Sequence, residues 1–420
     1  LVFPEVNFTL PQMVVDISQM SAILSQYREM VDGVLSRLVA LRSPGVVIEF
    51  EHAPQMTADV EIGTSVTAQT KNLMRRYYEK HGLKSALRVT VCDIREQERP
   101  PRMRTGEGWR KVLAAFEESA QQGADLLSIE STGGKEVSDQ ALLEGDIEGL
   151  LLALGILAPR DARALWRHVV DLCADGSSVA AGDTACAFAN TAMVLADKRY
   201  IPNVLAAVVR AMASVRTLVA HEEGAVGPTK DCAYEGPVVK AITGCPISLE
   251  GKSAACAHFS HVGNVAMAVC DLWSNESVQN VRLLSGFAPE VFAEILEYDC
   301  RLINTATAAG EGGTLRRLLV DSDVDKSVHA LIIAPSASVS IAEAIVSESS
   351  DYLRVRAAGL AACQLIRDAL SDGLLEIEDR ETPWLERIEE SLTAQDDESQ
   401  LLDRMADRYS GRFLPAEYGL

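Results

Sequence analysis

Three residues with metal-binding side chains lie close behind runs of residues typical of buried strands. Glu130 follows the run 125–129, Cys186 follows the run 178–182, and Cys232 ends the segment Lys230-Asp231-Cys232, which comes after the next run. The loops that follow the strands of a parallel barrel all emerge at one face. One carboxylate and two thiols could therefore converge on a single ion. Zinc accepts this donor set, and three protein ligands leave a fourth position for substrate.

The spacing of these three residues has no short signature such as C-x-x-C. From spacing alone, two buried structural thiols and a solvated glutamate are the more common interpretation. A second cluster, Cys256-Ala-His258-Phe-Ser-His261, is more compact, and on residue types alone it ranks first as a metal site. Its alternative is a strand-end loop whose histidines cap backbone groups or line a pocket.

Other motifs with known chemistry are incomplete in this sequence. Residues 132–136 resemble the end of a P-loop but lack its first glycine and its final hydroxyl residue. The glycine-rich segment 310–313 has no preceding strand, which a dinucleotide fingerprint requires. The Gly-x-Ser-x-Gly elbow of serine hydrolases does not occur. These three classes of enzyme are therefore not supported.

Short apolar or β-branched runs alternate with helical patterns along most of the chain. Eight runs are expected to be strands: 46–50, 87–92, 125–129, 178–182, 217–220, 246–249, 281–284 and 328–334. Alternating strands and helices predict a parallel sheet, and eight units over roughly 290 residues match a (β/α)8 TIM barrel. A doubly wound open sheet is the alternative. We expect a helical lead-in at 1–45, the barrel at 46–340, and an acidic helical extension at 341–420.

Composition limits the classes of protein further. The chain has 420 residues, of which 48% are hydrophobic, and a formal charge of −21. The charge argues against a nucleic-acid binder, and the apolar fraction is ample for a buried core. Nine scattered cysteines fit a reducing compartment better than a disulfide framework. The longest apolar run, 150–158, is about half of a membrane span. We therefore expect a soluble cytoplasmic protein without nucleic-acid or membrane partners.

Several longer stretches resemble a known family, the zinc-containing subunit of methanol:corrinoid methyltransferase from methanogens and acetogens. The likeness runs in order from about residue 40 to residue 330. It rests on runs of residues rather than on one short motif. The resembling stretches are 128–136, 182–186, 188–193, 224–228, 230–232, 241–244, 250–258 and 271–280.

The resemblance implies a zinc ion held by one glutamate and two cysteines at the mouth of a TIM barrel. By motif, Glu130 and Cys186 match the first two ligands. Cys232 is expected to be the third because it closes the Gly-Pro-x-Lys-Asp-Cys stretch, and Cys256 is its rival. The resemblance also implies a corrinoid carried by a separate protein, methanol as substrate, and a homodimer of this chain.

The chemistry implied is transfer of the methyl group of methanol to the Co(I) corrinoid, with zinc activating the methanol oxygen. Two thiolates and a carboxylate make the zinc electron-rich, so we expect a nearby proton donor. Asp183, three residues before Cys186, and Glu235, three residues after Cys232, are the candidates. Each could instead orient the ligands. The alternative functions are methyl transfer from a methylthiol or a methoxylated aromatic, a zinc hydrolase, and a non-catalytic docking scaffold.

Overall fold

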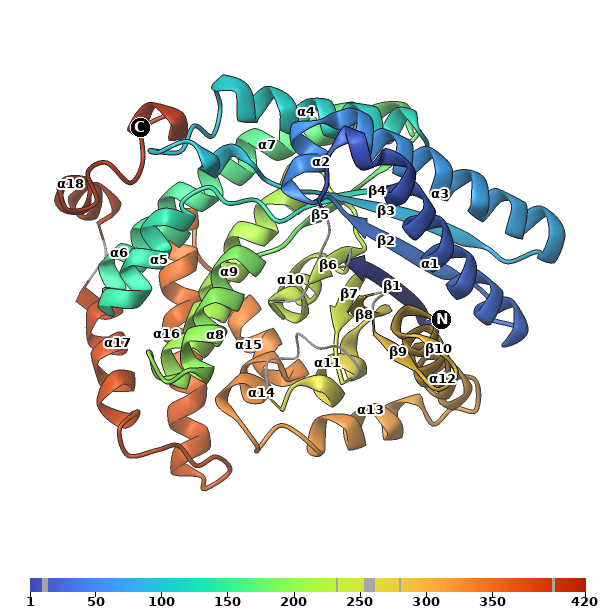
Figure 1. Cartoon of the computed structure of the whole chain (residues 1–420). Coiled ribbons are helices and arrows are strands. Elements are labelled where there is room, and N and C mark those ends of the chain that lie inside the picture. Colours follow the sequence, from blue (N-terminus) through green and yellow to red (C-terminus); the bar gives the residue numbers. More distant parts are fainter. Residues whose placement is uncertain (10–13, 232, 253–260, 279–280, 395–396) are drawn as a thin grey trace.

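The computed structural model describes residues 1–9, 14–231, 233–252, 261–278, 281–394 and 397–420. Within them, a sheet of eight parallel strands is surrounded by helices, as Figure 1 shows. The sheet order is β5-β4-β3-β2-β1-β8-β7-β6. The remaining seam lies between β5 and β6, where Val226 N donates to Ala180 O at 3.0 Å and Thr229 Oγ1 donates to Ala181 O at 3.3 Å. The strands are β1 (Phe3–Thr9), β2 (Val46–Glu51), β3 (Ser85–Val91), β4 (Leu126–Ile129), β5 (Val179–Asp183), β6 (Thr229–Asp231), β7 (Ile247–Glu250) and β8 (Leu272–Val278). The predicted TIM barrel is confirmed.

Helices follow each strand, as the parallel order requires. The outer helices are α1 (Met20–Ala40), α3 (Val60–His81), α4 (Gly106–Gln121), α7 (Ala158–Leu172), α9 (Asn203–Glu222), α10 (Gly236–Thr243), α11 (Gly263–Val269) and α12 (Ala288–Ala308). Shorter helices are inserted within three of the connections: α2 (Pro54–Ala58), α5 (Lys135–Glu144), α6 (Ile147–Leu151) and α8 (Thr191–Asp197). After the barrel come α13 (Gly312–Asp321), α14 (Val328–Ile333), α15 (Pro335–Val346), α16 (Asp351–Ser371), α17 (Thr382–Ala394) and α18 (Glu398–Arg408).

Five of the eight expected strands coincide with β2, β3, β4, β5 and β7 to within about two residues. The other three expectations are wrong. Residues 217–220 lie in α9, residues 328–334 lie largely in α14, and residues 281–284 contribute to a short hairpin of β9 (Arg282–Leu283) and β10 (Gly286–Phe287) outside the barrel. The barrel takes β1, β6 and β8 instead. The segment before residue 46 is therefore not only helical, because it supplies β1, which pairs with both β2 and β8.

The barrel interior is apolar only near the amino ends of its strands. There, a small cluster contains Val47, Leu126, Ala181 and Leu272. Above it, the inward positions carry buried polar or charged side chains, including Glu5, Glu49 and Arg88. The larger apolar clusters lie outside this sheet, between the strands and their helices and within the helical layer of α9, α16 and α17 (Figure 1).

Helix α9 is long and apolar enough to cross a membrane, but 94% of its most apolar stretch is buried inside the protein. It is the one helix of that kind among the residues that the structure describes. Other helices cover it on several sides, with α7 and α16 among its neighbours. Its apolar residues are thus accounted for by packing against other helices.

Candidate metal centre at the carboxyl end of the barrel

Glu130 and Cys186 follow two neighbouring strands. Ile129, the last residue of β4, pairs with Asp183, the last residue of β5, so the two following loops begin side by side. Glu130 comes directly after β4. Cys186 begins a π-helical turn, η5 (Cys186–Asn190), and is 4% exposed. This arrangement brings two of the three predicted ligands to the same edge of the barrel, as expected from their strand-end positions.

The Cys186 sulfur accepts a hydrogen bond from Asn190 Nδ2 at 3.4 Å. As a thiolate, this sulfur could act as a metal ligand. Cys232, the predicted third ligand, and its rival Cys256 lie outside the described residues, as does His258.

The Asp183 carboxylate connects the loops that carry Glu130 and Cys186. Its Oδ1 accepts from Ser131 N at 3.0 Å and from Thr184 N at 2.9 Å. Its Oδ2 accepts from Ser131 Oγ at 2.7 Å and from Trp166 Nε1 at 2.8 Å, and forms an ion pair with Arg216 Nη2 at 2.7 Å. In every one of these contacts the Asp183 carboxylate is the acceptor. This bonding favours the orienting role of Asp183 over its role as proton donor.

Glu235, the other candidate proton donor, is 1% exposed and joins the loop after β5 to the start of α10. Its Oε1 accepts from Ala185 N at 2.6 Å and from Thr217 Oγ1 at 2.8 Å. Its Oε2 has no hydrogen-bond partner within the described part of the chain. One oxygen thus fixes the side chain beside Cys186, while the other remains available for a proton or a ligand.

Acidic side chains gather inside the barrel near the mouth. Lys230 Nζ lies 3.3 Å from Glu49 Oε1 and 4.0 Å from Glu250 Oε1, and it also contacts Glu51. Glu250 is fully buried, and neither of its carboxyl oxygens has a hydrogen-bond partner among the described residues. Deeper in the barrel, Arg88 forms a two-point ion pair with Glu5, at 2.5 and 3.2 Å.

The two cations do not neutralise this acidic interior. Burial raises the pKa of Glu130 to about 8, and the nearby Glu49 and Glu276 carboxylates add to the effect. Burial also raises the pKa of Glu250 well above its usual value, although Lys230 opposes the shift. Carboxyl groups that share a buried site without enough cations favour their protonated form or a bound cation. The site therefore suits a metal ion and can also hold protons.

A second ionic cluster supports the loop after Glu130. Asp93 Oδ2 accepts from Thr132 N at 2.8 Å, and Arg95 bridges Asp93 and Asp161 at 2.8 Å each. Burial would raise the pKa of Asp93, but Arg95 outweighs burial and the pKa is lowered. A Cβ atom on Gly133 would lie 2.3 Å from Asp161 side-chain atoms, so only glycine fits there. The loop after Glu130 is therefore held by residues at the ends of both neighbouring strands, β3 and β5.

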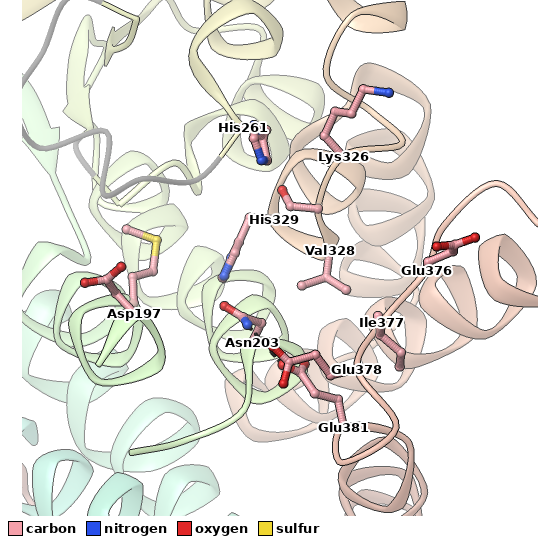
Figure 2. Close-up of a pocket in the computed structure, with 12 residues that line it drawn as sticks. Asp197, Asn203, His261, Lys326, Val328, His329, Glu376, Ile377, Glu378 and Glu381 are labelled. Carbon is pink, nitrogen blue, oxygen red and sulfur yellow. Dashed lines mark hydrogen bonds between the residues drawn. The ribbon is translucent and has the colours of Figure 1, made fainter. Parts of the chain in front are cut away.

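Of the compact Cys/His cluster at 256–261, the structure describes only His261. Figure 2 shows His261 facing His329 across a cavity of about 260 Å³. Helices α8, α9 and α14 and the segment before α17 supply the other walls, and neither Glu130 nor Cys186 lines the cavity. Among the described residues, no group of three or more His, Cys, Asp or Glu side chains has a metal-binding arrangement.

The expected strand 217–220 lies in helix α9, so the polar residues that follow it end a helix. His221 and Glu222 end helix α9 rather than a strand. Glu222 pairs there with Arg163 and Arg354. Sequence reasoning missed Glu49, Lys230 and Glu250 as parts of the mouth. A usable signal existed in Ile-Ser-Leu-Glu at 247–250, where polar residues alternate with apolar ones in a short strand.

The fold and the position of these residues define a barrel enzyme whose chemistry lies at the carboxyl ends of its strands. The chain belongs to the family of methanol-cobalamin methyltransferase B subunits, whose family model matches residues 1–419. This finding confirms the resemblance and the enzyme class, a methanol:corrinoid protein methyltransferase.

A curated relative and a solved structure agree with the family. The chain is 37% identical to the methanol–corrinoid protein co-methyltransferase of Methanosarcina barkeri, over 99% of this chain and 91% of the relative. It also resembles a chain in the crystal structure of the methanol:cobalamin methyltransferase complex MtaBC from Methanosarcina barkeri. That match has a TM-score of 0.95 and 35% identity, and covers all of this chain and 92% of the other.

Proposed function

We propose that this chain transfers the methyl group of methanol to the Co(I) corrinoid of a separate carrier protein, with a zinc ion at Glu130, Cys186 and Cys232. The names of the family, the relative and the solved complex support methanol as donor and a corrinoid protein as partner. The observation that carries the zinc site is the bonding of Asp183, which fixes the Glu130 and Cys186 loops side by side.

The residues present fit such a metal. Glu130 is a half-buried carboxyl whose pKa is raised to about 8 by burial and by neighbouring carboxylates, and a bound divalent cation would favour its ionised form. Cys186 is a nearly buried sulfur on the loop after the neighbouring strand. Zinc accepts both carboxylate and thiolate ligands, and Cys232 completes the set of three in this proposal. When bound, zinc supplies Lewis-acid polarisation of the methanol oxygen.

The chain's own residues must orient the leaving oxygen and supply its proton. As the methyl carbon bonds to cobalt through the electron pair of Co(I), the C–O bond breaks and its electron pair stays on oxygen. That oxygen must gain a proton to leave as water. Glu235 is placed to orient or protonate it, because Oε1 is fixed by Ala185 N and Oε2 has no partner in the described part of the structure. Glu250 lies in the same interior, where burial raises its pKa well above the usual value.

Metal analysis combined with absorption spectroscopy tests the proposal. The protein is reduced, loaded with zinc, freed of excess metal and mixed with the Co(I) carrier protein and methanol. We expect one zinc per chain and a methanol-dependent change from the Co(I) to the methyl-Co(III) spectrum. Cys186→Ala should lose both properties. Cys173→Ala is the matched control, because Cys173 is a free, partly exposed cysteine at the end of α7. A zinc-free wild-type chain with full activity would overturn the zinc assignment.

A further inference from the structure

The last residues of the sequence, 413–420, reach back to the loop that follows Glu130. Tyr418 lies in the short helix η7 (Pro415–Tyr418), is 2% exposed, and its hydroxyl oxygen accepts a hydrogen bond from Gly134 N at 3.0 Å. Gly134 is four residues after Glu130 and directly precedes α5. A contact between residues 284 positions apart thus joins the chain end to the candidate metal centre.

The same segment also holds the neighbouring loop. Glu417 is 7% exposed, and its Oε2 accepts from Arg104 N at 2.6 Å while its Oε1 accepts from Thr105 Oγ1. Arg104 and Thr105 lie in the loop that leads from β3 into α4. The chain end lies beside this loop in Figure 1. Residues 417 and 418 therefore bind the loops after β3 and β4 to each other.

The loop after Glu130 depends on such outside contacts for its position. Glu130 lies beyond the last ladder pair of β4, so the strand fixes it from one side only. On the other side, backbone N–H groups of Ser131, Thr132 and Gly134 donate to Asp183, Asp93 and Tyr418 respectively. The first two acceptors come from the adjacent strand ends. Tyr418 supplies the third from outside the barrel.

Close packing transmits the position of Tyr418 to the loop. Gly134 has a φ of 86°, and a Cβ atom there would lie 3.0 Å from Ala153 O and from Leu157 Cβ. The Tyr418 ring packs edge-on against Phe413, with ring centroids 6.0 Å apart. The loop therefore has little room to shift while the tyrosine is in place.

We infer that Tyr418 is a positioning residue for the metal centre: it holds the loop that orients Glu130. This inference rests on the proposed function, because it assumes that Glu130 binds the metal. Groups that orient metal ligands from behind typically change metal affinity about 10–100-fold when they are removed. Tyr418 acts through one loop contact, so we expect the lower end of that range.

The test compares Tyr418→Phe with Tyr409→Phe. Both changes remove one hydroxyl from a buried tyrosine and keep the ring. Tyr409 donates to Asp146 Oδ2 at 2.8 Å, at the start of α6 and away from the Glu130 loop. Zinc affinity is measured on reduced full-length protein by competition with a chromogenic chelator. Hydrogen exchange of the peptide covering 131–135 reports the loop directly.

We expect Tyr418→Phe to weaken zinc binding about tenfold and to speed exchange in 131–135. Tyr409→Phe should leave both unchanged, although both variants should lower the melting temperature. Equal zinc affinity in Tyr418→Phe and wild type, or equal losses in the two variants, would overturn the inference. A wild-type chain that binds no zinc would instead remove the proposed function. If Tyr418→Phe does not fold, Glu417→Gln takes its place, because it loosens the same final segment from the loop after β3. It should speed exchange in 131–135 and weaken zinc binding, and wild-type values of both would overturn the inference.

Discussion

Replacing Asp183 with asparagine separates an orienting role from an acid role. The carboxylate accepts four hydrogen bonds, two on each oxygen, and pairs with Arg216, which is itself buried. An asparagine side chain has one acceptor oxygen, so whichever way it turns, at least two donors face its NH₂ group. The Arg216 guanidinium also loses its carboxylate partner inside the protein.

The expected size of the effect follows from that loss. Removing one member of a buried ion pair typically destabilises a protein by about 3–5 kcal/mol, which is a large part of a usual stability of about 5–15 kcal/mol. We expect Asp183→Asn to lower the free energy of unfolding by that amount, and to weaken zinc binding because the Glu130 and Cys186 loops are no longer joined. Denaturant unfolding and chelator competition measure the two effects.

Glu235→Gln is the contrasting variant. Its Oε1 can still accept from Ala185 N and Thr217 Oγ1, and its Nε2 takes the place of an oxygen that has no partner among the described residues. Stability and zinc content should therefore change little, while the rate of methyl transfer falls about 10²–10⁴-fold, the usual range for loss of a proton donor. Suppose instead that Asp183→Asn keeps wild-type stability and zinc content but loses rate. The assignment of roles to the two carboxyl groups would then be reversed.

The remaining predictions concern the ligands, pH and the partner. Cys186→Ala and Cys232→Ala should each lose zinc and activity; full zinc in Cys232→Ala together with loss in Cys256→Ala would show that Cys256 is the third ligand. Burial lowers the pKa of His52 from 6.5 to about 4. The unfolded chain therefore binds a proton below pH 6.5 that the folded chain does not, so about 3 kcal/mol of stability should be lost between pH 6.5 and 4. His52→Gln should flatten this part of the unfolding curve, and an unchanged curve would exclude His52 as the cause. The carrier protein with its corrinoid should co-elute with this chain at micromolar concentration in size-exclusion chromatography, and the chain alone should elute as a dimer; separate elution would argue against stable docking.

The strands that could be predicted from the sequence are short runs rich in apolar and β-branched residues. Residues 46–50 and 87–92 are runs of this kind, each with one charged residue, Glu49 or Arg88, and became β2 and β3. The missed strands β1 and β8 place Glu5, Asn7 and Glu276 toward a polar barrel interior, which interrupts the apolar pattern. Residues 217–220 were mistaken for a strand because α9 is buried on all sides, which hides its helical period.

The sequence predicted those parts of the candidate site that directly follow a strand. Glu130 and Cys186 lie together because their strands are adjacent, a relation that the order of strands in the chain already contained. The buried carboxyl group of Glu49 could not be foreseen as a partner of Lys230, since β2 and β6 are distant in the sequence. Glu250 could have been, because β7 is the next strand after β6 and pairs with it. The contact from Tyr418 to Gly134 had no sequence signal, because it depends on how the final segment folds back.

The π-helical turn at Cys186–Asn190 bears on which changes in chain length the enzyme can tolerate. A π turn holds one more residue than an α-helical turn, and each residue of an α-helix rotates the chain by about 100°. Deleting one residue from 187–190 would let the turn become regular helix continuous with α8. It would also swing Cys186 about 100° around the helix axis, away from Glu130. A deletion of this kind would keep the barrel strands and every ligand residue of the chain, and yet separate the two ligands.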